Sequence, residues 1–135
     1  MGWSGYTIYS GDGTQTRHYD FLKWAKVASE DEVFDNNWLQ YNKTIVPKDR
    51  IPILFKNLNL IVNKMPKKQF WTEDSAIEWQ MFAALLLDNQ IKLPNIDRVR
   101  AKEATEYLIQ ESGDFDKPYL RRKHLRKFLE KLNNN

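Results

Sequence analysis

The chain has 135 residues, of which 41% are hydrophobic, 13% aromatic and 29% charged, and its formal net charge is +3. This length and composition predict one domain with a single core, spanning residues 1–135. The absence of cysteine excludes disulfides and thiolate metal sites, and it is typical of a reducing compartment, so we expect a cytoplasmic protein. The sequence opens without a secretory leader pattern and holds no apolar run near the ~20 residues that span a bilayer, so we expect no membrane partner.

The basic residues are concentrated at the C-terminal end of the sequence. Residues 117–135 hold seven Lys and Arg residues and one acid, whereas residues 1–116 hold 14 basic and 17 acidic residues. A patch of one sign attracts surfaces of the opposite sign and speeds their encounter. This segregation indicates either a solvated, solubilising surface or a partner that carries carboxylates or phosphates.

The first predicted element is a short extended segment, residues 1–13, which is rich in aromatic and β-branched residues and ends in a turn at Gly11-Asp12-Gly13. A helix is then expected to start at Thr14 or Thr16, either of which can cap it, and to run to about residue 28. Its periodic residues recur at helical spacing: His18, Phe21, Leu22, Ala25 and Ala28, with Trp24 beside them.

Two further helices are predicted before residue 65. A capping box at residues 29–32 indicates a short one over about 29–39. Asp49 is expected to cap the next, over 49–64, because Pro52 then lies in the first turn, where its missing N–H costs nothing. The apolar stripe of this helix is Ile51, Leu54, Phe55, Leu58, Ile61, Val62 and Met65.

The following helix, capped by Thr72 and running over 73–89, is apolar on nearly every side in its second half. Such a helix is buried on most faces, so we expect it at the centre of a bundle. Asn95 is expected to cap the next helix, and Gly113 to end it. Its inner side is predicted to hold Ile96, Val99, Ala104, Tyr107 and Leu108.

The last helix, residues 117–132, is basic and amphipathic, with Pro118 at the first position. A helical wheel places one group of residues on the side that docks: Leu125, Phe128, Leu129 and Leu132. The opposite side carries the cations Arg122, Lys123, Arg126, Lys127 and Lys131, together with Tyr119. Arg121 falls inside the apolar arc, either before docking begins or reaching an acid such as Glu103, Glu106 or Asp114. The whole pattern predicts a mainly α, single-domain bundle of about five or six helices, with a short extended N-terminal segment.

No pattern in the sequence points to catalysis. The two histidines, His18 and His124, are far apart, so no local metal motif exists, and His18 is expected to cap its helix or lie at the surface. Ser10, His18 and Asp20 lack the strained nucleophile turn of a hydrolase. We therefore expect a protein that is not an enzyme, with no catalytic, cofactor-binding or metal-binding residues.

Aromatic and basic residues are the candidates for partner binding, because Trp, Tyr and Arg are enriched at interaction hot spots. The aromatic residues near the N-terminus have the better chance of exposure, and the basic face of the last helix supplies the charge. The predicted partner-binding residues are Arg122, Lys123, Arg126, Lys127, Lys131, Tyr119, Trp3, Tyr6 and Tyr9.

Three stretches carry a resemblance to a known group of proteins. They are the opening Met1-Gly2-Trp3-Ser4-Gly5-Tyr6 with Asp12 behind it, Ile45-Val46-Pro47-Lys48-Asp49-Arg50, and Asp74-Ser75-Ala76-Ile77-Glu78-Trp79-Gln80-Met81 leading to Ala83-Ala84-Leu85-Leu86. The chain resembles small uncharacterised bacterial and bacteriophage proteins that begin with a Met-Gly-x-Trp-Gly type of motif. The resemblance implies a mostly helical, phage-encoded accessory protein and carries no catalytic residues with it.

Three functions remain open from the sequence. The first is a non-enzymatic phage-type protein that binds a host protein and inhibits or redirects it, in host takeover or against antiviral defence. The second is a nucleic-acid-binding protein that uses the basic last helix, although the acidic body argues against it. The third is a sponge that sequesters a signalling nucleotide at the loop Gly11-Asp12-Gly13 or at a subunit interface.

Overall fold

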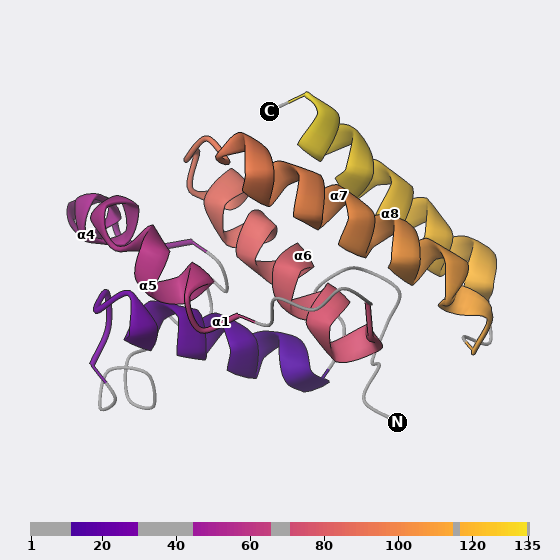
Figure 1. Ribbon diagram of the computed structural model, residues 1–135, viewed down its shortest axis with the longest axis horizontal. Coiled ribbons are helices and arrows are strands. Elements are labelled where there is room, and N and C mark those ends of the chain that lie inside the picture. Colours follow the sequence, from indigo (N-terminus) through magenta and orange to yellow (C-terminus); the bar gives the residue numbers. More distant parts are fainter. Residues whose placement is uncertain (1–11, 30–44, 66–70, 115–116, 135) are drawn as a thin grey trace.

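The computed structural model describes residues 12–29, 45–65, 71–114 and 117–134, with side chains from residue 17 onward (Figure 1). These residues form six α-helices and two short 3₁₀ helices, and no strand lies among them. In chain order they are α1 (Asp12–Trp24), η1 (Lys48–Arg50), α4 (Ile51–Lys56), α5 (Leu58–Val62), α6 (Glu73–Asp88), α7 (Asn95–Gln110), η2 (Ser112–Asp114) and α8 (Pro118–Asn133). The predicted mainly α bundle is therefore confirmed, whereas residues 1–11 and the short helix predicted over 29–39 fall outside the described residues, apart from Ser29.

Helix α6 lies at the centre of the bundle, as its sequence predicts. Figure 1 shows α6 between α1 and α7, with α8 on the far side of α7. The ring of Phe21 on α1 meets that of Phe82 on α6 edge-on, with 6.2 Å between the centroids. The N-terminus of α6 is fixed by the predicted cap, since the Thr72 hydroxyl accepts a hydrogen bond from the Ser75 N–H and Ser75 Oγ accepts one from the Thr72 N–H.

Helix α1 differs from its prediction at both ends. It begins at Asp12, so Asp12 and Gly13 belong to its first turn, and the turn predicted there is wrong at these two positions. It ends at Trp24 rather than near residue 28, because Lys26 adopts the left-handed conformation with φ of 61°. The Val27 N–H then donates to the Leu22 carbonyl at 2.9 Å, which closes the helix. His18, expected to cap the helix or lie at the surface, is buried in the interior.

The single helix predicted over 49–64 is divided into η1, α4 and α5. The break lies at Asn57, whose side-chain amide donates a hydrogen bond to the Ala25 carbonyl at 2.9 Å. A second bond, from Arg50 Nη1 to the Val27 carbonyl at 3.0 Å, also holds this segment against the end of α1. These two contacts fix the short helices against α1. Phe55, which the sequence predicts on the apolar stripe, is exposed.

Helix α7 starts one residue earlier than predicted. Asn95 is its first residue rather than its cap, and no side chain caps it. Ile96 and Val99 are exposed, so their predicted place on the inner side is wrong. The buried side of α7 is instead made by residues that include Ala101, Ala104, Thr105 and Leu108. The helix ends at Gln110, and Gly113 lies in η2 beyond it.

Arg121 is almost fully buried at the start of α8. Burial lowers the pKa of its guanidinium to about 10, and the negative charge of Glu73 opposes that shift. Glu73, at the start of α6, is thus an acid whose charge acts on Arg121, in addition to the candidates predicted from the sequence. The apolar position of Arg121 on the helical wheel correctly indicates a buried residue.

A carboxylate half-buried between α1 and α6 makes the stability depend on pH. Burial raises the pKa of Glu78 above its ordinary 4.5; Arg17 opposes this shift, and Asp74 and Asp20 add to it. The folded chain therefore holds this proton more readily than the unfolded chain. The contribution to stability is fully present below pH 4.5 and is lost as the pH rises through the raised pKa of the folded state.

Glu78→Gln is accordingly expected to be more stable than the wild type at pH 7, with the difference shrinking as the pH falls toward 4.5. Urea unfolding of both proteins across this range measures the difference. Glu111→Gln, at an exposed position just after α7, is the control and should match the wild type throughout. A Glu78→Gln protein no more stable than the wild type at pH 7 would contradict the account.

Candidate binding face on the last helix

Helix α8 is a docked element of the bundle. Its buried side is Leu125, Phe128 and Leu132, which belong to the same core as α6 and α7, and Leu129 packs partly buried beside them. Pro118 takes the first position of the helix, where it needs no N–H partner. The docking side predicted from the sequence is thus the side that is buried, and the orientation of the opposite side is fixed with it.

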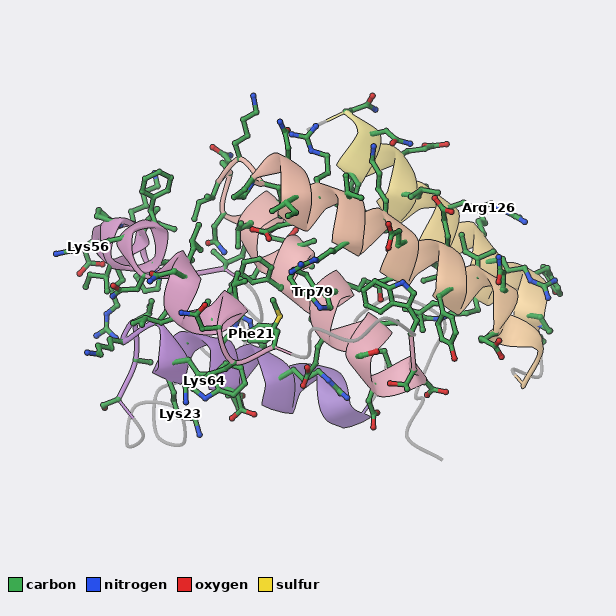
Figure 2. The ribbon with its side chains drawn as sticks, viewed as in Figure 1. Phe21, Lys23, Lys56, Lys64, Trp79 and Arg126 are labelled. Carbon is green, nitrogen blue, oxygen red and sulfur yellow. The ribbon has the colours of Figure 1, made fainter. Side chains whose placement is uncertain are left out.

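The outward side of α8 carries four exposed cations within nine residues. Lys123, Arg126, Lys127 and Lys131 are all exposed, and they follow one another at steps of three, one and four residues. Residues three or four apart on a helix are neighbours, with about 5–6 Å between their Cβ atoms. Figure 2 shows Arg126 at the outer edge of the molecule, pointing away from the bundle. These four residues form the cationic stripe of α8.

The cationic stripe forms no ion pair within the part of the chain that the structure describes. The two salt bridges found there, Arg17 to Asp74 at 3.1 Å and Lys23 to Asp20 at 3.4 Å, both lie on the α1 side of the molecule. Charges that are neutralised within the chain would offer little to a partner. The stripe therefore presents a positive potential toward solvent, which the exposed Glu130 on the same helix partly offsets.

Arg122, predicted as a partner-binding residue, has a different place. It is half-buried, and its Nε donates a hydrogen bond to Ser112 Oγ at 2.8 Å. Ser112 Oγ in turn donates to the Ile109 carbonyl at 2.7 Å. This relay ties the start of α8 to the end of α7. Helical periodicity cannot predict this contact. The approach of Arg122 to Ser112 depends on the path that the chain takes between α7 and α8.

The predicted aromatic contacts are only partly described. Tyr119 is 65% exposed at the N-terminal end of α8, on the outward side of the helix. Trp3, Tyr6 and Tyr9 lie outside the described residues. Tyr119 is therefore the aromatic residue that the structure associates with the cationic stripe.

Among the described residues, no group of three or more His, Asp or Glu side chains is arranged to hold a metal ion. Within the same ranges, no helix has the length and apolar character needed to cross a membrane.

Comparison with known proteins provides no relative. No protein-family model, curated protein or solved structure matches the chain. The class defined by the fold is a helical bundle with a docked basic helix.

Proposed function

We propose that this is a non-enzymatic binding protein that docks the cationic stripe of α8 on an acidic surface of another protein. In line with the resemblance of its sequence, the partner is a host protein that a phage-type accessory protein inhibits or redirects. The observation that carries the proposal is the exposure of four cations at fixed spacing on a docked helix. None of the four forms an ion pair with another described residue.

An acidic protein suits this surface better than nucleic acid does. The stripe from Lys123 to Lys131 spans only about 12 Å along the helix axis, at 1.5 Å per residue. The exposed Glu130 lies within it, and Glu103 and Glu106 are exposed on the adjacent helix α7. Phosphate backbones present one sign of charge over long distances, so interspersed acids weaken their binding. A protein surface of mixed charge can match both signs.

The test is a pull-down from bacterial lysate with the triple variant Lys123→Glu, Arg126→Glu and Lys127→Glu. Arg122 is left unchanged because it holds the α7–α8 turn. The matched control is Lys48→Glu, Lys56→Glu and Lys92→Glu, three exposed positions outside α8 that give the same net charge. We expect the α8 variant to lose the wild-type partners, by about tenfold or more in recovered amount, for a loss of about 1.4 kcal/mol, and the control to retain them.

Equal recovery of the partners by the two variants would overturn the proposal, because binding would then not depend on the position of the stripe. Binding to a DNA duplex, followed by fluorescence anisotropy at several salt concentrations, tests the alternative. Counterion release predicts that the logarithm of the affinity falls with the logarithm of salt by about 0.9 per phosphate contact. A steep slope that the α8 variant abolishes would favour nucleic-acid binding instead.

A further inference from the structure

Helix α7 exposes a stripe of its own, which the bundle does not cover. Its members follow one another at alternating steps of three and four residues, which places them on one side of the helix. They are Ile96, Val99, Glu103, Glu106 and Gln110, and all five are exposed. Ile96, at 63% exposure, is a large aliphatic residue left in contact with water. Neither Glu103 nor Glu106 forms an ion pair within the described residues.

The outward side of α8 has the complementary pattern. Its exposed residues Tyr119, Lys123, Arg126, Glu130 and Asn133 follow one another at steps of four, three, four and three. Read in the reverse direction, these steps are those of the α7 stripe. An α8 helix laid antiparallel on α7 therefore keeps the same register along both stripes.

This register pairs opposite charges. It places Glu103 opposite Arg126 and Glu106 opposite Lys123. The other three pairs are Gln110 with Tyr119, Val99 with Glu130, and Ile96 with Asn133. Within one chain the two outward sides form no ion pair with each other, since neither salt bridge of the described residues involves α7 or α8. A second copy of the chain carries the complementary surface for each stripe.

We propose that the chain self-associates, with α8 of one copy docked antiparallel on the outward stripe of α7 of the other. A two-fold axis makes this contact twice, because each copy offers both stripes. The contact would cover the cationic stripe, so that an acidic partner would have to displace the second copy. That consequence rests on the proposed function, whereas self-association does not.

The experiment is sedimentation equilibrium of the full chain over a range of concentrations. We expect a reversible dimer that weakens as salt is added, because exposed charge pairs are screened. Variant X, Glu103→Lys with Glu106→Lys, and variant Y, Lys123→Glu with Arg126→Glu, should each dimerise at least about tenfold more weakly than the wild type. A mixture of X and Y should recover the dimer, since both contacts then pair opposite charges.

Two controls separate the α7–α8 contact from general effects. Lys48→Glu with Lys56→Glu gives the same net charge as variant Y at positions outside α8. It keeps both stripes, so it should dimerise by itself as the wild type does, whereas variant Y should not. Ile96→Ala should weaken the dimer, whereas Phe55→Ala on α4, removing a side chain of nearly equal exposure at 64%, should leave it unchanged.

Three results would overturn the proposal. They are a wild type that stays monomeric at the highest concentration, variants X and Y that dimerise as the wild type does, and a mixture of X and Y that fails to recover the dimer. Circular dichroism of each variant establishes that it is folded. None of these measurements uses an external partner, so their failure leaves the pull-down result untouched.

Discussion

Trp79→Ala is expected to destabilise the protein by about 3–5 kcal/mol, because it removes the largest fully buried side chain of the described core. Trp79 is 1% exposed on the central helix α6. Its ring meets that of Phe82 edge-on at 6.0 Å, and the Arg100 guanidinium of α7 lies 5.1 Å from its centroid. Figure 2 shows it in the middle of the molecule. A loss of this size is a large part of the total of about 5–15 kcal/mol typical of a domain.

Urea unfolding followed by circular dichroism measures this effect. Tyr119→Ala is the control, since an aromatic residue 65% exposed on α8 should change the stability by no more than about 0.5 kcal/mol. If Trp79→Ala unfolded at the same urea concentration as the control, the placement of α6 at the centre of the core would be wrong.

Gln80→Met is expected to stabilise the protein by about 1–3 kcal/mol, which is the cost of a buried polar group left without a partner. Gln80 is fully buried on α6, and neither its amide nitrogen nor its amide oxygen makes a hydrogen bond within the described part of the chain. Methionine has a similar length and volume and carries no group that must be desolvated. The substitution therefore keeps the packing and removes the cost.

The same urea measurement compares Gln80→Met with Gln110→Met at an exposed position at the end of α7. We expect a higher unfolding midpoint for the first and little change for the second. A lower midpoint for Gln80→Met would mean that the amide is held by hydrogen bonds, and would refute this account of Gln80.

The elements that could be predicted from the sequence are those whose local pattern and burial agree. Helix α6 is apolar on nearly all sides and begins at a hydroxyl cap, so both its position and its start at Thr72 follow from local chemistry. The docking side of α8 follows from the spacing of Leu125, Phe128 and Leu132 in the same way. In both helices the residues needed to form the element also bury it.

The ends of helices are harder to predict where the burial of a following residue, rather than a local sequence pattern, decides them. Lys26 and Gln90 end α1 and α6 in the left-handed conformation that glycine usually supplies, at φ of 61° and 60°. The buried Val27 and Ile91 follow them directly, and their N–H groups close the helices on the Leu22 and Leu86 carbonyls. Since no glycine stands at position 26, the sequence offers no local signal for the early end of α1. The predicted end of α6 near Asn89 agrees with the structure.

The sequence predicts the exposed cations of the candidate site but not the hydrogen bond that holds the start of α8. Helical periodicity places Lys123, Arg126 and Lys127 outward, because exposure on a docked helix depends only on the direction of its apolar side. The bond between Arg122 and Ser112 depends instead on the path of the turn after α7. The apolar positions Ile96 and Val99 were assigned inward for the same reason, since periodicity alone does not say which helices are available to cover them.

Hydrogen exchange of the α8 backbone amides is the most direct test of the central claim, that the cations are presented at fixed spacing by a docked helix. The account predicts that the amides of residues 125–132 are protected like those of α7, against which this helix packs. Exchange of these amides at the rate of an unfolded peptide would contradict it. The charges would then belong to a flexible basic tail, and the specific binding proposed for the cationic stripe would be lost with the helix.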